Sequence, residues 1–227
     1  MKKIFALSLV LFICSNVFAQ NNQYIKASDS DPAAKAMLKK VKARYEAYKT
    51  LEASFVLDIM IPEQEKIVQK GILSRQGDKY RIISPNQEVI CDGNAIWFIL
   101  SNNKEVQIND MPDPDEDDSI LTPQSIFNFY EKDNFVYFIT NEPVENGKKL
   151  QEITFKPLDR ETSDYSKLVL VVNKKTAEII RVKTFAKDGS RYTFYIEKLK
   201  PNVPFDKGYF TFNAKNYPDY YVEDLRD

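Results

Sequence analysis

The sequence contains no histidine, one tryptophan, two cysteines and six glycines among its 227 residues. Without histidine the chain has no Ser-His-Asp or Cys-His nucleophile pair, no histidine general base and no histidine metal ligand. So little glycine excludes a collagen-like chain, and a net charge of −1 lacks the basic field that attracts nucleic acid. The composition therefore favours a protein that holds a ligand, with no metal, no cofactor and no nucleic acid partner.

Phenylalanine and tyrosine are abundant, with 15 and 13 copies, and such residues favour strands. From Ala53 to Ile61 apolar and polar residues alternate, and similar segments follow, separated by turn signals such as Asp92-Gly93. The predicted strands are 52–61, 66–75, 78–84, 87–92, 95–100, 104–109, 134–140, 149–156, 166–172, 178–187, 190–199 and 208–213. This spacing predicts one antiparallel sheet curled into a barrel or half-barrel.

Two segments outside the strands predict helices. Asp31 is a suitable N-cap and Pro32 fits the first helical position, so a helix is expected over 32–49. Thr122-Pro123 repeats this signal before a short apolar helix. The apolar residues of the two helices are Met37, Val41, Tyr45, Tyr48, Ile126, Phe127, Phe129 and Tyr130. Apolar helices over the concave face of a curled sheet predict a cavity for a lipid-sized ligand.

Residues 1–19 have the pattern of a secretory signal peptide: a basic start, an apolar run from Ile4 to Cys14 and a cleavage site near Ala19. A retained anchor is disfavoured, because this run is shorter than the ~20 residues that span a bilayer. The large Ile13 disfavours acylation at Cys14. We expect residues 20–31 to form a flexible tether and 32–227 a single domain. Cys91 is expected to be a small buried side chain rather than a reactive thiol.

The segment from Asp110 to Asp118 reads DMPDPDEDD. It is rich in oxygen ligands that would suit calcium, but it lacks the glycine and the terminal glutamate of an EF-hand loop. A solvated charged loop is the favoured interpretation. Paired carboxylates for glycoside hydrolysis remain open, since 33 acidic residues make many pairs and none lies in a recognisable motif.

Residues 71–99 carry an ordered set of short motifs: Gly71-Ile72-Leu73, Tyr80-Arg81, Pro85, Asp92-Gly93 and Ile96-Trp97-Phe98. This set resembles the LolA family of periplasmic carriers of outer-membrane lipoproteins. The flanking segments 50–55, 122–123 and 209–212 are similar as well. The resemblance covers essentially the whole chain after residue 19.

The resemblance implies a mainly β fold, an unclosed β-barrel covered by helices, with a periplasmic location and no catalysed reaction. Its implied cargo is triacylated lipoprotein, received from an inner-membrane ABC lipoprotein-releasing complex and delivered to an outer-membrane acceptor, by a protein expected to be a monomer. The residues expected at the acyl-chain cavity or its mouth are Phe55, Leu57, Leu73, Tyr80, Ile82 and Trp97. The residues expected in the lid are Val41, Tyr45, Ile126, Phe127, Phe129 and Tyr130.

The family also has an arginine that holds the lid closed in the free form. Arg75 is the best match to it, although an alignment shifted by one residue would place Gln76 there. Three other functions remain open: a sensor of lipids or lipoproteins with the same fold, a membrane-anchored acceptor, and a carboxylate-based hydrolase of cell-wall glycan.

Overall fold

The computed structural model describes residues 26–111, 125–127, 129–131 and 133–226. The strands that precede residue 111 are β1 (Thr50–Met60), β2 (Ile67–Gln76), β3 (Lys79–Ile83), β4 (Gln87–Cys91), β5 (Ala95–Leu100) and β6 (Glu105–Asp110). The later strands are β7 (Phe135–Asn141), β8 (Val144–Glu145), β9 (Lys148–Pro157), β10 (Tyr165–Asn173), β11 (Ile179–Ala186), β12 (Arg191–Pro201) and β13 (Tyr221–Asp224).

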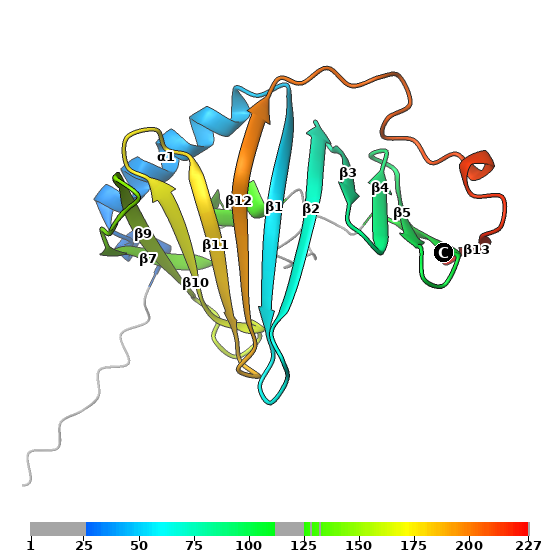
Figure 1. Ribbon diagram of the computed structural model, residues 1–227. Helices are drawn as coiled ribbons and strands as arrows, with labels where there is room; N and C mark the ends of the chain where they lie inside the picture. The colour runs from blue at the N-terminus through cyan, green and yellow to red at the C-terminus, as the bar shows by residue number, and fades with distance from the viewer. Residues whose placement is uncertain (1–25, 112–124, 128, 132, 227) are drawn as a thin grey trace, which may run out of the picture.

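These strands form one curved sheet in the order β13-β6-β5-β4-β3-β2-β1-β12-β11-β10-β9-β7, with β8 paired to β9 (Figure 1). Different strands lie at the two edges, so the sheet does not close into a barrel. The predicted fold class, a mainly β protein with an open curled sheet and a helical cover, is confirmed. One pairing differs from the prediction, because β13 joins β6 in parallel while the other pairs are antiparallel.

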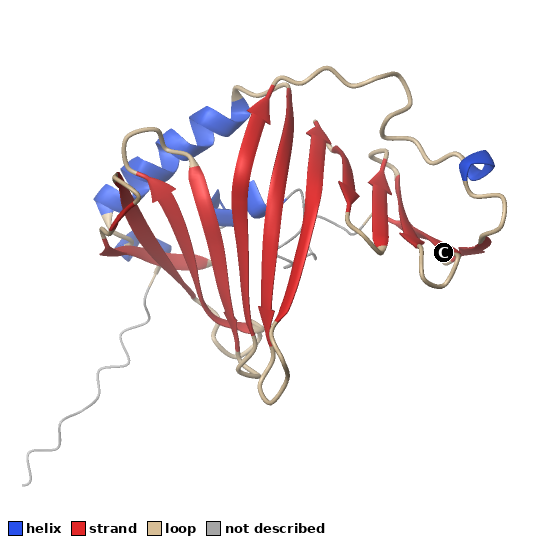
Figure 2. Ribbon diagram, viewed as in Figure 1, coloured by secondary structure: helices blue, strands red, loops and turns tan. Residues whose placement is uncertain are grey.

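The long helix α1 (Pro32–Glu46) lies across one side of the sheet (Figure 2). Its start follows the prediction, since the Asp31 side chain accepts a hydrogen bond of 2.8 Å from the Ala33 N–H and Pro32 opens the helix. It ends three residues before the predicted residue 49. The Tyr48 N–H turns back to the Tyr45 carbonyl and the Lys49 N–H bonds Asn202, so the chain is already directed into β1.

Four short 3₁₀ turns complete the described helical structure: η1 (Ala27–Asp29), η2 (Ser125–Phe127), η3 (Phe129–Glu131) and η4 (Ala214–Asn216). The predicted apolar helix over 126–130 is therefore two 3₁₀ turns, and its expected start at Thr122-Pro123 lies outside the described residues. The strand predicted over 208–213 is wrong, because this stretch is a turn and a bend followed by irregular chain. The signal peptide predicted over 1–19 also lies outside the described residues.

The described part of the predicted tether, residues 26–31, is not free. Ser30 is buried, and its hydroxyl accepts a hydrogen bond from the Tyr137 N–H at 3.2 Å. The Asp31 N–H in turn donates to the Tyr137 carbonyl at 2.9 Å. These bonds fix the chain to the edge strand β7 directly before α1 begins.

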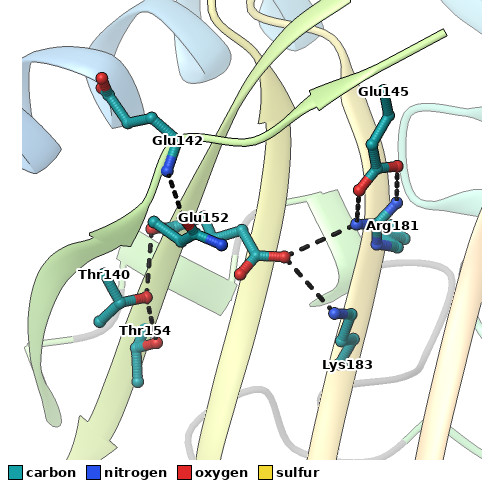
Figure 3. Close-up of polar contacts among 8 residues, drawn as sticks. Thr140, Glu142, Glu145, Glu152, Thr154, Arg181 and Lys183 are labelled. Carbon is teal, nitrogen blue, oxygen red and sulfur yellow. Dashed lines mark hydrogen bonds and ion pairs between the residues drawn. The ribbon is translucent and has the colours of Figure 1, made fainter.

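The outer face of β9 to β11 carries a set of polar and charged side chains (Figure 3), beside a small apolar cluster of Leu150, Val169 and Val171. Arg181 donates two hydrogen bonds of 2.6 and 2.7 Å to the Glu145 carboxylate, which ties the β8–β9 hairpin to β11. Glu152 lies 3.5 Å from the Lys183 ammonium and 3.6 Å from Arg181. Ion pairs and the small cluster of Leu150, Val169 and Val171 thus share this face.

After β12 the C-terminal segment runs past β1 and β2 to the half of the sheet that contains β3 to β6 (Figure 1). There it packs on the outer face of these strands. We call residues 202–226 the strap. Arg81 donates a hydrogen bond of 2.9 Å to the Tyr209 carbonyl and pairs with Glu88, which also accepts a bond from the Tyr217 hydroxyl. Trp97 stacks on Phe212 with 5.8 Å between ring centres. The strap thus gives these strands a second covered face.

Candidate functional site

The inner, concave face of the sheet carries one continuous apolar cluster. It joins the buried face of α1, the two turns η2 and η3, and strands from both halves of the sheet. The buried lid residues in it are Ala34, Met37, Leu38, Val41, Tyr45, Ile126, Phe127, Phe129 and Tyr130. We call α1, η2 and η3 together the lid. All six residues predicted for the lid lie in this cluster.

Tyr45 fixes the C-terminal end of α1 to both the lid turns and the sheet. Its ring stacks on Phe127 with 4.9 Å between centres. Its hydroxyl accepts a 3.1 Å hydrogen bond from the buried Ile179 N–H of β11, and burial raises the pKa of the phenol. Nearby, Lys42 and Glu131 form an ion pair of 2.6 Å between α1 and η3. Most of the lid attachment is apolar and aromatic.

The Phe55 ring lies flat on the sheet over Gly71. A Cβ atom placed on Gly71 would lie 2.7 Å from the Phe55 ring and 2.6 Å from the Ile83 carbonyl oxygen, closer than atoms in contact approach. Phe55 also stacks on Phe194 of β12 with 4.9 Å between ring centres. The missing side chain at Gly71 is therefore what lets an aromatic floor form at the centre of the concave face.

Five of the six residues predicted for the cavity lie together on the concave face: Phe55, Leu57, Leu73, Tyr80 and Ile82. Leu57 and Ile82 are partly exposed at the border of the cluster. Tyr80 is 4% exposed, so it belongs to the buried wall rather than to a cavity mouth.

The placement of Trp97 in the cavity wall is wrong. Across the strands, the concave-face residue Tyr80 lies opposite Cys91, and Cys91 lies opposite Ile96. Trp97 lies instead in the row of Ile90 and Ile108. Side chains alternate along a strand, so Trp97 points to the outer face and packs under the strap. Its neighbours Ile96 and Phe98 occupy the concave face instead.

Several concave-face residues were not predicted: Cys91, Ile96, Phe98, Met111, Phe155, Phe194 and Ile196. Side chains alternate between the two faces of a strand, so Ile96 and Phe98 can be assigned to the concave face once Trp97 is known to face outward. Cys91 is fully buried, as expected, and burial raises the pKa of its thiol; its sulfur lies 3.2 Å from that of Met111. A buried thiol that stays protonated is a poor nucleophile, so Cys91 contributes to the core by packing.

Arg75 extends from the end of β2 on the concave side, where its strand neighbours are Leu51 and Tyr80. Its guanidinium carbon lies 5.4 Å from the centre of the Phe127 ring in η2. Burial lowers the pKa of this group. Gln76, the alternative latch residue, is exposed and follows Arg75 on the other face. The geometry therefore pairs Arg75, and not Gln76, with a lid residue.

Two classes of site are not found in the described part of the chain. No group of three or more His, Cys, Asp or Glu side chains able to hold a metal ion occurs there, and residues 112–118 of the acidic loop lie outside it. Within the same residues, no helix combines the length and apolar character needed to cross a bilayer.

Comparison with protein families gives a match to the model described as "Outer membrane lipoprotein carrier protein LolA" over residues 47–213. No curated protein sequence matches the chain. Among solved structures, an uncharacterized conserved protein from Thermus thermophilus is similar with a TM-score of 0.55 and 8% identity, over 86% of this chain and 99% of that one.

Two further solved structures are similar at lower TM-scores. Lipoprotein LppX from Mycobacterium tuberculosis has a TM-score of 0.49 and 11% identity, over 78% of this chain and 100% of its own. The LolA superfamily protein NE2245 from Nitrosomonas europaea has a TM-score of 0.42 and 10% identity, over 83% of this chain and 98% of its own.

An open curled sheet whose apolar concave face lies beneath a helical lid defines the class of half-barrel binding proteins. The family model matches most of the chain, from residue 47 to residue 213. The chain belongs to the LolA family of outer-membrane lipoprotein carrier proteins.

Proposed function

We propose that this protein is a periplasmic carrier that encloses the acyl chains of lipoproteins against its concave face and moves them from the inner to the outer membrane. The observation that supports this most directly is the single apolar cluster shared by the lid and the sheet. Because the lid touches the sheet mainly through apolar and aromatic side chains, acyl chains can replace those contacts without leaving buried polar groups unpaired.

The border of the cluster offers an entry for such chains. Its partly buried members include Leu57, Ile82, Phe98, Met111 and Ile196. Each methylene of an acyl chain that leaves water contributes about 0.8 kcal/mol. Transport of a lipidated protein through an aqueous space therefore needs an apolar surface of this kind, and a lid that opens keeps the affinity low enough for release.

The remaining parts of the proposal follow from family membership and from the concave face. The partners are triacylated lipoproteins, an inner-membrane ABC lipoprotein-releasing complex and an outer-membrane acceptor. The protein itself catalyses no reaction. A carboxylate-based hydrolase would need two acidic groups roughly 5–10 Å apart in a polar cleft, and the apolar concave face disfavours this alternative.

Native mass spectrometry of protein purified from periplasm tests the proposal, with two substitutions at adjacent positions of β3. Ile82→Glu puts a charge at the border of the concave cluster, while Ile83→Glu puts the same charge on the outer face, where the side chain is already 38% exposed. We expect triacylated lipoprotein to co-purify with the wild type and with the Ile83→Glu variant. The amount that co-purifies with the Ile82→Glu variant should be about tenfold lower.

Far-ultraviolet circular dichroism would establish that both variants are folded. Equal cargo with the two folded variants would show that acyl chains bind elsewhere. An empty wild-type protein that releases sugars from cell-wall glycan would instead support the hydrolase.

A further inference from the structure

A hollow of about 360 Å³ lies at the end of the sheet that is remote from α1. It is lined by Lys156, Arg160, Tyr165, Ser166 and Lys187. These residues come from the end of β9, the β9–β10 loop, the start of β10 and the β11–β12 turn. Three cations converge on it from separate segments, and no carboxylate lines it.

The segments around the hollow are held in place by hydrogen bonds. Lys187 donates one bond of 2.9 Å from its backbone N–H to the Asp164 carbonyl and one of 3.0 Å from its ammonium to the Glu161 carbonyl. Ser166 donates a bond of 3.0 Å to the Phe185 carbonyl. The hollow is therefore a fixed feature of two adjoining turns.

The β9–β10 loop carries three acidic residues, Asp159, Glu161 and Asp164, and the carboxylate of Asp159 is engaged by the loop itself. Asp159 accepts bonds from the Glu161 and Thr162 N–H groups and from the Thr162 hydroxyl, which lowers the pKa of its carboxyl. The positive character continues beyond the hollow, since the Lys167 ammonium lies 4.4 Å from the centre of the Phe185 ring.

We propose that this hollow binds a phosphate anion, presented by a phospholipid headgroup or by a small soluble phosphate ester. A guanidinium matches two oxygens of a phosphate at once, and two ammonium groups add charge without fixed geometry. The hollow lies at the end of the sheet, where its Tyr165 packs against the edge of the concave cluster, and its anion binding does not depend on the proposed carrier function.

The phospholipid source is included because the β1–β2 hairpin, which carries exposed apolar side chains, lies at the same end of the sheet as the β11–β12 turn (Figure 1). Met60, Ile67 and Val68 at the β1–β2 hairpin are 47%, 44% and 50% exposed. Pro62 of this hairpin lies beside Gly189 of the β11–β12 turn. These apolar side chains flank a turn that carries Glu63, Glu65 and Lys66, and they lie at the same end of the sheet as the cationic hollow, so a lipid surface is one source of phosphate that the test includes.

The test uses the full chain after signal-peptide removal and two double variants of equal charge. Lys156→Gln with Arg160→Gln removes two cations from the hollow and retains Lys187, which holds the loop. Lys148→Gln with Lys149→Gln removes two cations from the opposite end of β9. One arm measures sedimentation with phosphatidylglycerol–phosphatidylcholine vesicles, and the other titrates glycerol 3-phosphate by calorimetry.

We expect the wild type to bind in at least one arm, and the arm identifies the source of the phosphate. Affinity should fall about fivefold for each cation removed from the hollow, the usual contribution of a Lys or Arg near an anionic surface. The Lys148 and Lys149 variant should change affinity less than twofold. Absence of binding in both arms, or an equal loss in the two variants, would overturn the proposal.

Discussion

The guanidinium of Arg75 lies 5.4 Å from the centre of the Phe127 ring, so β2 and η2 are joined by a cation–π contact on the concave side. Such a contact contributes about 2 kcal/mol when it is desolvated. Arg75 is half-buried at this contact, and burial lowers the pKa of its guanidinium. The contact joins the sheet to the lid and so helps to set how readily the lid opens.

We therefore expect Arg75→Leu to speed amide hydrogen exchange in the lid by about tenfold, because the lid loses its contact with β2 while the sheet keeps its pairing. Exchange detected by mass spectrometry on peptides that span 125–131 measures this. Gln76→Leu is the matched control on the neighbouring position and should leave the exchange unchanged. Equal acceleration by the two variants would contradict a specific role for Arg75.

Gly71→Ala should destabilise the protein by about 1–3 kcal/mol, the usual cost of overfilling a packed core. The new Cβ would lie 2.6 Å from the Ile83 carbonyl oxygen and 2.7 Å from the Phe55 ring, so the ring and β3 must move apart. Urea unfolding followed by circular dichroism gives the change in the free energy of unfolding.

Combining Gly71→Ala with Phe55→Leu separates the two clashes. The smaller side chain leaves room for the methyl group, so the double variant should be more stable than the sum of the single effects predicts. A Gly71→Ala protein as stable as the wild type would mean that the floor of the concave face adapts freely.

Local signals were enough to predict α1 and strands β1 to β6 to within a few residues. The Asp31-Pro32 start, the period of two and the Asp92-Gly93 turn depend on neighbouring residues only, and local geometry enforces them. The same alternation predicts that the adjacent residues Tyr80 and Arg81 lie on opposite faces of the sheet. The lid residues were likewise identified by their apolar character.

The strap could not be predicted, because its structure depends on partners far along the chain. Residues 208–213 are aromatic and β-branched enough to indicate a strand, yet they form a turn, a bend and irregular chain that cover Trp97 and its neighbours. The strand β13 has only four residues, and two of them are acidic, so its own sequence does not predict a strand. It becomes one by pairing with the edge of β6. Trp97 was misplaced for the same reason, since only the strap partly covers a tryptophan that faces outward from β5.

Alkaline pH should weaken the attachment of the strap. Burial, followed by the hydrogen bond to Glu88, raises the pKa of Tyr217 to about 12, whereas a tyrosine in an unfolded chain titrates near pH 10. Between about pH 10 and 12 the folded state keeps a proton that the unfolded state loses, so stability falls as pH rises through this range. Below about pH 10 the contribution of Tyr217 is fully present.

Urea unfolding at about pH 8 and pH 11 measures this effect. Tyr217→Phe should be less stable than the wild type at the lower pH, because the bond to Glu88 is lost, and should lose less stability between the two pH values. Tyr221→Phe is the matched control, since Tyr221 is 67% exposed, and it should behave as the wild type. A Tyr217→Phe protein with the wild-type pH dependence would show that Tyr217 does not carry it.

Trp97, the one tryptophan of the sequence, should report on the strap and not on the ligand. Its ring stacks on Phe212 on the outer face, with the sheet between it and the concave cluster. Phe212→Ala should shift its emission to longer wavelength, because water reaches the indole. Addition of a triacylated lipopeptide should leave the wild-type emission unchanged, although the lipopeptide binds on the other face.

The matched control moves the indole across the sheet by one residue. In a Trp97→Phe, Phe98→Trp protein the indole lies at the border of the concave cluster, and lipopeptide should then shift its emission to shorter wavelength as acyl chains displace water from it. If the wild-type emission responds to lipopeptide and that of the relocated tryptophan does not, the acyl chains bind on the outer face, and the assignment of the concave face is wrong.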